Sequence, residues 1–306
     1  MRAPNLLLAG FQKCGSTYLA SALGAHPQIA LAKNKEPNIY LHYNEKIYPS
    51  RFAEAFGEGT ARYLCDASIN YAVSDGALQR AAAWSPDDTR IILVVRDPVE
   101  RVLSSYLHMK KRFAERRGIA EILARLPAEP EAIRSTEIRL VLEAAQAREL
   151  DLFARVDVHD EIWLHPLYVS NGLYALHLDR MLRFFPEDRV KIVRFEDLVA
   201  KPGRVLGEIG DFLGLPGLTE ALAPATPSNR TLLSTNVSVA TRTPRWSRRL
   251  QDFQKRLRPN TRRHVTASAF PEEIRRQVFR LTEAESRRLF ERCGWRFAGS
   301  AWDHAT

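Results

Sequence analysis

Apolar residues along the chain form short runs that alternate with stretches of helical periodicity. The first run covers Leu6 to Ala9, and a helical pattern follows from Ser16 to Leu23. Further apolar runs at 29–31, 90–95 and 189–195 are short, and the later two are rich in β-branched residues, which favours strands buried on both faces. Strands that alternate with helices predict an α/β fold in which helices cover a central parallel sheet.

Two segments depart from this alternation. The stretch at about 115–160 is rich in Ala, Glu and Arg, which predicts a helical insertion between core units. A basic C-terminal segment covers about 240–306, and its run at 242–264 holds nine Lys or Arg residues against one acid. Helical periodicity returns at 271–293. We expect a single domain over residues 1–306.

Length and charge limit the classes of function. A chain of 306 residues with 26% charged residues is long enough to bury a sizeable core. The formal net charge of +9 favours anionic ligands, among them phosphates, acidic glycans and the surface of a membrane. Nucleic acid is not expected as a partner, because Trp246 and Phe253 are the only aromatic residues within the basic run.

Cysteine usage and hydropathy bear on location. Cys14, Cys65 and Cys293 have neither metal-ligand spacing nor the even number of a disulfide framework, which favours a reducing compartment. No apolar stretch reaches the roughly 18 residues of a transmembrane helix. We therefore expect a cytoplasmic protein, for which peripheral contact with a membrane stays open.

Residues 10–17, Gly-Phe-Gln-Lys-Cys-Gly-Ser-Thr, lie between the first predicted strand and the first predicted helix. In that position, backbone N–H groups and the helix N-terminus bind phosphate. Gly10 and Gly15 have the spacing of a nucleotide-hydrolysing P-loop, but Ser16 occupies the place of its lysine and the lysine stands earlier, at Lys13. These residues predict a phosphate-binding loop of a different class.

The predicted strand at 90–95 is followed by Arg96, where magnesium-dependent phosphoryl transfer needs an acid that holds the metal. We therefore expect no metal, although Asp97 leaves a metal-binding carboxylate open. A P-loop kinase or NTPase with an atypical loop remains the alternative at this point.

Two motifs resemble those of the PAPS-dependent sulfotransferases, which use 3′-phosphoadenosine 5′-phosphosulfate (PAPS) as the donor. GFQKCGSTYLASAL is similar to the family's 5′-phosphosulfate loop, and VVRDPVERVLSSY is similar to its 3′-phosphate element. The likeness is greatest to the heparan sulfate and glycan branch and its bacterial relatives. It implies a P-loop NTPase-like sulfotransferase fold and PAPS as cosubstrate. The implied contacts are Lys13 with the bridging oxygen, Cys14, Gly15, Ser16 and Thr17 with the 5′-phosphate, and Arg96 and Ser104 with the 3′-phosphate.

The resemblance also implies a general base. The glycan branch carries a Glu shortly after the second strand, and Glu36 of Lys35-Glu36-Pro37 stands at that place. The alternatives are a solvated surface Lys-Glu pair and His42, because the branch that acts on phenols and steroids uses a histidine. The chain departs from the glycan pattern at Asn38, where some members carry His, and at Ala67, where a lysine is usual.

The sequence thus predicts a sulfotransferase that moves the sulfuryl group of PAPS to a hydroxyl or amine of a glycan, a lipid or a small natural product. Lys13 and Glu36 are the predicted catalytic residues. A non-catalytic nucleotide-binding protein is the second alternative, and neither the acceptor nor the oligomeric state follows from the sequence.

Overall fold

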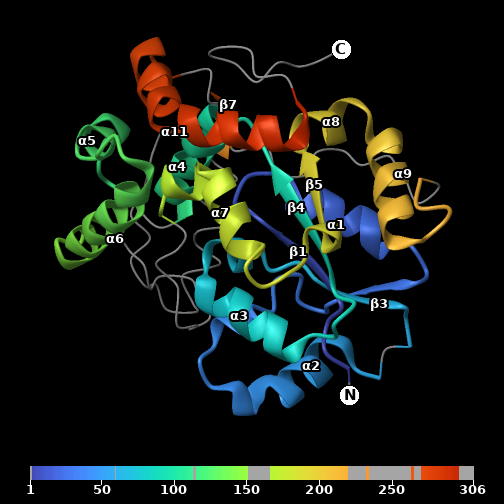
Figure 1. Cartoon of the computed structure of the whole chain (residues 1–306). Coiled ribbons are helices and arrows are strands. Elements are labelled where there is room, and N and C mark those ends of the chain that lie inside the picture. The colour runs from blue at the N-terminus through green and yellow to red at the C-terminus, as the bar shows by residue number, and fades with distance from the viewer. Residues whose placement is uncertain are drawn as a thin grey trace, which may run out of the picture.

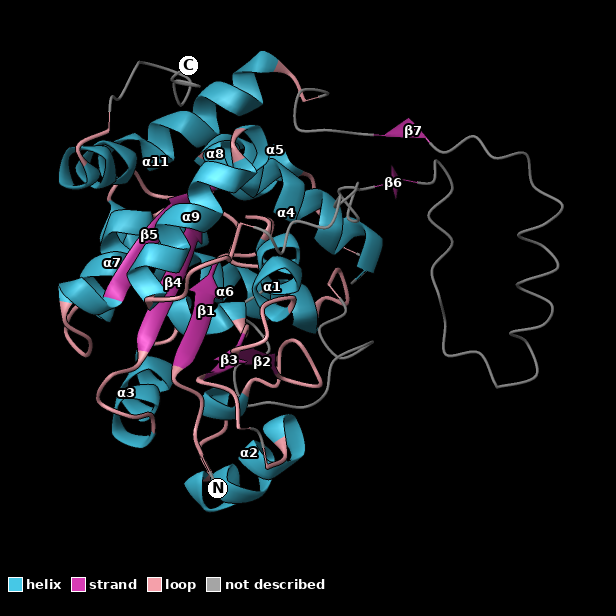
Figure 2. Cartoon of the chain, turned by 90° about the vertical axis from the view of Figure 1, so that its right-hand side faces the viewer, coloured by secondary structure: helices cyan, strands magenta, loops and turns pink. Residues whose placement is uncertain are grey.

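The computed structural model describes residues 2–58, 60–112, 115–150, 166–219, 232–233, 263–264 and 270–295. A five-stranded sheet of order β2-β3-β1-β4-β5 forms the centre of the fold (Figures 1 and 2). Every neighbouring pair of strands in this sheet is parallel, which confirms the predicted α/β fold. The strands are β1 (Leu6–Gly10), β2 (Ile29–Leu31), β3 (Tyr63–Asp66), β4 (Arg90–Val95) and β5 (Val190–Arg194).

The sequence located four of these strands and missed one. β2 and β4 have the predicted bounds, whereas β5 is one residue shorter at each end, because a 3₁₀ helix ends at Arg189 and an α-helix begins at Phe195. The missed strand is β3, which spans only four residues. It is buried throughout because it pairs with β1 on one side and β2 on the other. Its strand character therefore comes from its neighbours rather than from its own sequence pattern.

Helices flank the sheet (Figures 1 and 2), and the long C-terminal helix α11 packs against α4 and α7. The helices are α1 (Ser16–Gly24), α2 (Tyr48–Phe56), α3 (Asp75–Trp84), α4 (Pro98–Arg112), α5 (Ile119–Ala124), α6 (Pro130–Gln146), α7 (Tyr174–Met181), α8 (Phe195–Ala200), α9 (Pro202–Leu213) and α11 (Glu272–Cys293). Within the described part of the chain, none of the helices has the length and apolar character needed to cross a bilayer.

The described part of the predicted insertion, up to residue 150, forms α5 and α6 and contains no strand. Residues 151–160 lie outside the described residues, as does the basic run apart from the two residues of β7 (Arg263–His264). β7 pairs antiparallel with β6 (Leu232–Leu233). The extent of the single domain stays a prediction.

The carboxyl ends of the parallel strands bring the candidate site residues to one edge of the sheet. β1 leads into the loop at 10–17, β4 into Arg96, and β2 into the segment that holds Glu36. β3 ends at Asp66, between β2 and β1 in the strand order. Ligands of open parallel sheets bind at such an edge, so the topology alone selects it as the place of the site.

Candidate active site

The loop at residues 10–17, called the phosphate loop below, turns from β1 into α1 through two left-handed residues. Lys13 has a φ of 73° and Gly15 a φ of 84°. The dihedral angle of Gly15 favours glycine, and the space requires it, because a Cβ atom there would lie 2.6 Å from a ring carbon of Phe195. Among the described residues, the backbone N–H groups of Gly15, Ser16 and Thr17 have no backbone acceptor. They are free to bind an anion at the helix N-terminus.

Cys14 differs from its neighbours in the phosphate loop. Its backbone N–H already donates to the carbonyl of Phe11 at 3.3 Å. Its thiol is buried, and the sulfur lies 3.8 Å from the hydroxyl of Tyr174. Burial raises the pKa of the Cys14 thiol to about 11. The side chain is therefore a neutral packing group.

Lys13 is a half-buried cation with neither a hydrogen-bond acceptor nor an ion-pair partner for its amine within the described residues. Burial lowers the pKa of Lys13, and the nearby charges of Arg96 and Lys111 lower it further. Three cations that gather where one amine has no counterion make a site for an anion. Lys111, on α4, was not identified from the sequence.

Arg96 joins the end of β4 to the phosphate loop. Its Nη1 donates to the carbonyl oxygen of Lys13 at 3.1 Å, and its guanidinium lies 4.9 Å from the ring centre of Phe195. Its Nη2 lies 3.6 Å from a carboxylate oxygen of Glu100. The guanidinium is therefore fixed in orientation beside the loop before any ligand binds.

Ser104 lies on α4 and is half-buried. Its spacing from Glu100 and Lys111, four and seven residues, places the three side chains on one face of the helix. The next residue, Ser105, donates to the Oε1 atom of Gln12 at 2.6 Å and so fastens α4 to the phosphate loop. The same helical spacing is the signal by which Lys111 could have been found.

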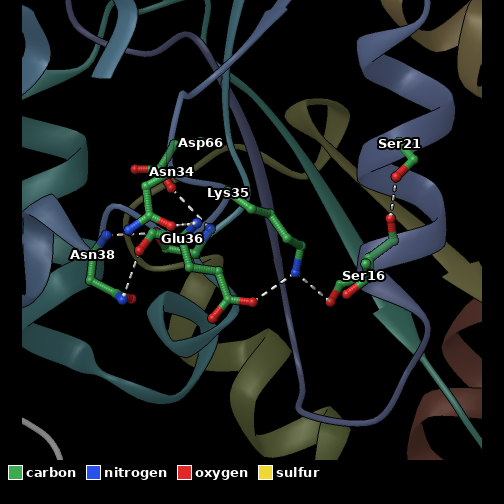
Figure 3. Close-up of polar contacts among 9 residues, drawn as sticks. Ser16, Ser21, Asn34, Lys35, Glu36, Asn38 and Asp66 are labelled. Carbon is green, nitrogen blue, oxygen red and sulfur yellow. Dashed lines mark hydrogen bonds and ion pairs between the residues drawn. The ribbon is translucent and has the colours of Figure 1, made fainter. Parts of the chain in front are cut away.

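Lys35 and Glu36 follow β2 and turn toward the phosphate loop. The Nζ atom of Lys35 lies 2.7 Å from Oε1 of Glu36 and donates to Oγ of Ser16 at 3.1 Å (Figure 3). Both side chains are only partly exposed, 23% for Lys35 and 31% for Glu36. The pair is therefore tied to the phosphate loop and is not a solvated surface pair. Lys35 had no predicted role.

The segment at Ala67 and Ser68, which lacks the lysine usual in the glycan branch, supports the turn that holds Glu36. The backbone N–H of Ala67 donates to the carbonyl of Lys35 at 3.2 Å, and the backbone N–H of Asn38 donates to Oγ of Ser68 at 2.8 Å. Asn38 has a left-handed φ of 53°, a conformation that Asn tolerates better than most residues.

Asp66 anchors this support at the end of β3. Its two carboxylate oxygens accept hydrogen bonds from the backbone N–H of Ser68 at 2.9 Å and from the hydroxyl of Tyr71 at 2.8 Å. Asp66 is fully buried, and burial raises its pKa to about 6.

Two further acids have structural partners. Asp97 accepts a hydrogen bond from the backbone N–H of Glu100 at 2.9 Å, which caps the start of α4. Glu196 accepts from the backbone N–H of Asp97 at 2.9 Å. His42 follows the 3₁₀ helix at 39–41, and its backbone carbonyl accepts from the Tyr48 hydroxyl at 2.7 Å. Its part as an alternative base stays a prediction.

Comparison with known proteins gives concordant matches. The family model described as sulfotransferase domain matches residues 3–227. Heparan sulfate glucosamine 3-O-sulfotransferase 6 of Mus musculus is 31% identical over 220 residues, which cover 70% of this chain and 53% of that protein. The bifunctional heparan sulfate N-deacetylase/N-sulfotransferase 3 of Homo sapiens is 26% identical over 226 residues, 70% of this chain and 22% of that protein. The chain thus spans about half the length of the first of these relatives.

A solved structure shares the fold over nearly the whole length. The crystal structure of a sulfotransferase from Alicyclobacillus acidocaldarius superposes with a TM-score of 0.61 at 20% sequence identity, and the match covers 98% of this chain and 99% of that chain.

Proposed function

Since the chain belongs to the sulfotransferase family, we propose that it transfers the sulfuryl group of PAPS to a hydroxyl or amine acceptor. The observation that carries the proposal is the amine of Lys13, unpaired among the described residues, in a loop whose backbone N–H groups at Gly15, Ser16 and Thr17 have no backbone acceptor there. This arrangement fits a 5′-phosphosulfate, because the loop offers one cation and several amide donors to an anion. The Phe195 ring packs so closely on Gly15 that no side chain can stand at this position.

Each residue has a separate task in this proposal. The amides of Gly15 to Thr17 would hold the 5′-phosphate, and Arg96 with Ser104 would hold the 3′-phosphate, for which the fixed fork of a guanidinium is well suited. ATP has no phosphate at the 3′ position, so this contact would distinguish the two nucleotides. Lys111 adds positive charge to the same face of α4.

PAPS supplies a sulfuryl group whose bond to the 5′-phosphate oxygen breaks, so that the electron pair of that bond leaves with the phosphate. Lys13 would stabilise the negative charge on this oxygen, a contact worth about 1.5–3 kcal/mol. Glu36 would accept the proton that the acceptor hydroxyl or amine loses as its new bond to sulfur forms. General-base help of this kind is worth roughly 10²- to 10⁴-fold in rate.

The first acceptor to test is an acidic glycan. The relatives are named for heparan sulfate, and the net charge of +9 attracts polyanions. Lipids and small natural products are the other acceptor classes, and mass spectrometry of a cell extract incubated with PAPS would detect any compound that gains one sulfate. Location in the cytoplasm stays a prediction.

A thermal-shift comparison separates sulfotransferase from kinase. We expect adenosine 3′,5′-bisphosphate (PAP) to raise the Tm without a metal ion, and ATP with Mg²⁺ to raise it less. The opposite order would favour the P-loop kinase or NTPase. Sulfate release from labelled PAPS then tests for catalysis, and its absence in a protein that binds PAP would favour the non-catalytic nucleotide-binding protein.

Point variants test the site. We expect Lys13→Ala and Arg96→Ala to lose PAPS turnover, while Lys33→Ala, an exposed lysine nearby, keeps it. Near-normal turnover in both site variants would overturn the proposed assignment.

A further inference from the structure

The side chain of Lys35 contacts both halves of the candidate site (Figure 3). Ser16 belongs to the phosphate loop and opens α1, whereas Glu36 belongs to the turn after β2. The ammonium group lies between them, 3.1 Å from the hydroxyl oxygen and 2.7 Å from the carboxylate oxygen.

We propose that Lys35 is a positioning residue that fixes the Glu36 carboxylate relative to the phosphate loop. The inference rests on the proposed function, since it gives Lys35 a task only if Glu36 is the base. In this role Lys35 contributes orientation for the reaction and adds nothing essential to the binding of the nucleotide.

The hydrogen-bonding capacity of the three groups allows this arrangement. A lysine ammonium has three N–H donors, of which one serves Ser16 and another serves Glu36. The Ser16 hydroxyl accepts from Lys35, so its own O–H stays available as a donor to a phosphate. The second oxygen of Glu36 stays available for the acceptor proton. Lys35 therefore contacts both groups and leaves the Ser16 O–H donor and the second Glu36 oxygen available.

The backbone beneath Lys35 and Glu36 is held at both ends of the turn. Before the pair, the backbone N–H of Ala32 donates to the carbonyl of Cys65 at 3.0 Å, and the carbonyl of Lys35 itself accepts from Ala67. After the pair, the side chain of Asn38 donates to the carbonyl of Glu36 at 3.0 Å. With the backbone fixed, the remaining freedom of the Glu36 carboxylate is in its side-chain torsions, and Lys35 is the contact that restrains them.

The test uses Lys35→Met, which keeps most of the side-chain length and removes the charge. It is compared with Lys35→Arg and with the exposed control Lys33→Met. Turnover is measured as sulfate release from PAPS, with water as the acceptor where no other is known, and PAP affinity is measured by calorimetry. We expect kcat of Lys35→Met to fall about 10- to 100-fold, as for a misplaced catalytic group, with its PAP affinity within about threefold of the wild type. Lys35→Arg should recover part of the loss.

A double-mutant cycle with Glu36→Gln separates positioning from an independent effect. If Lys35 acts through Glu36, the double variant should turn over PAPS at about the rate of Glu36→Gln alone, because the second change removes nothing further. If the rate of the double variant falls by the product of the two single effects, the inference is overturned. Crystal structures of the wild type and Lys35→Met with PAP add a readout besides activity, in which we expect the Glu36 carboxylate to be displaced in the variant. An unchanged carboxylate would also overturn it.

Failure of the inference and failure of the proposed function give different results. Wild-type protein that neither binds PAP nor releases sulfate overturns the proposed function and this inference with it. Wild-type protein that does both, with Lys35→Met no different from Lys33→Met, overturns the role of Lys35 alone. A large loss of PAP affinity with unchanged kcat would make Lys35 a phosphate-binding residue instead.

Discussion

The guanidinium of Arg96 donates a hydrogen bond of 3.1 Å to the backbone carbonyl of Lys13, a residue 83 positions earlier in the chain. This contact holds the left-handed residue of the phosphate loop against the end of β4. The same guanidinium lies over the ring of Phe195, whose edge in turn leaves no room for a side chain at Gly15. The shape of the phosphate loop thus depends on residues from three strand ends.

Replacement of Arg96 by Lys should therefore weaken nucleotide binding although it keeps the charge. An ammonium group lacks the planar fork that donates to Lys13, stacks on Phe195 and still offers donors to a phosphate. Loss of one charge-assisted contact of about 1.5–3 kcal/mol corresponds to at least a tenfold weaker PAP affinity, measurable by calorimetry. Arg51→Lys, on the exposed side of α2, is the matched control and should bind PAP normally. Wild-type affinity in Arg96→Lys would contradict the prediction.

Gly15→Ala should damage the phosphate loop more than its backbone angle alone explains. A left-handed non-glycine residue costs about 1–2 kcal/mol, and here the new methyl group would also meet the Phe195 ring at 2.6 Å. Gly294, which follows α11, is left-handed like Gly15, with a φ of 64°, and has no atom within 4 Å of an added Cβ, so Gly294→Ala isolates the backbone cost. We expect both variants to lower the Tm and only Gly15→Ala to lose stabilisation by PAP. Equal PAP shifts in the two variants would argue against a role for the turn.

The thiols of Cys14 and Cys65 should be protected from alkylation in the folded protein. Cys14 and Cys65 are fully buried, and burial raises the pKa of each thiol, to about 11 for Cys14. Cys293 is half-buried, and burial raises its pKa to about 11 as well. At pH 8 we expect Cys14 and Cys65 to resist alkylation for as long as the fold persists, and all three to react in guanidinium chloride. Peptide mass spectrometry identifies the labelled residues, and rapid native labelling of Cys14 would contradict its buried position.

Asp66 should make stability fall as the pH rises through weakly acidic values. Burial raises its pKa to about 6 from an ordinary value of 3.8, so the folded state holds a proton that the unfolded state has lost between these values. The stabilisation from the protonated form is complete below pH 3.8 and is lost as the pH passes 6. The free energy of unfolding of Asp66→Asn, relative to that of the wild type, should rise by up to about 3 kcal/mol between pH 4 and pH 7. Urea unfolding at both pH values measures this change, and a pH-independent difference between the two proteins would refute it.

Local patterns in the sequence determined the central features of the site. An apolar run, a glycine spacing and a following helix are all contained in residues 6–23, so the strand, the phosphate loop and α1 could be located without the fold. The position of Lys13, three residues before Ser16, separated this loop from a nucleotide-hydrolysing P-loop in the same way. Arg96 was found at the end of a recognisable strand, and Glu36 through the resemblance to the glycan branch, which carries a Glu shortly after the second strand.

Tertiary structure decided which distant residues complete the site. β3 is a strand because two neighbours offer it hydrogen bonds, and its end carries the Asp66 support for the Glu36 turn. Lys111 and Lys35 gain their place near the phosphate loop from the packing of α4 and the order of the strands. A local pattern reports only the contacts between residues that are near in sequence. The parallel sheet gathers strand ends that are far apart in the chain, and that convergence places a lysine between the loop serine and the glutamate.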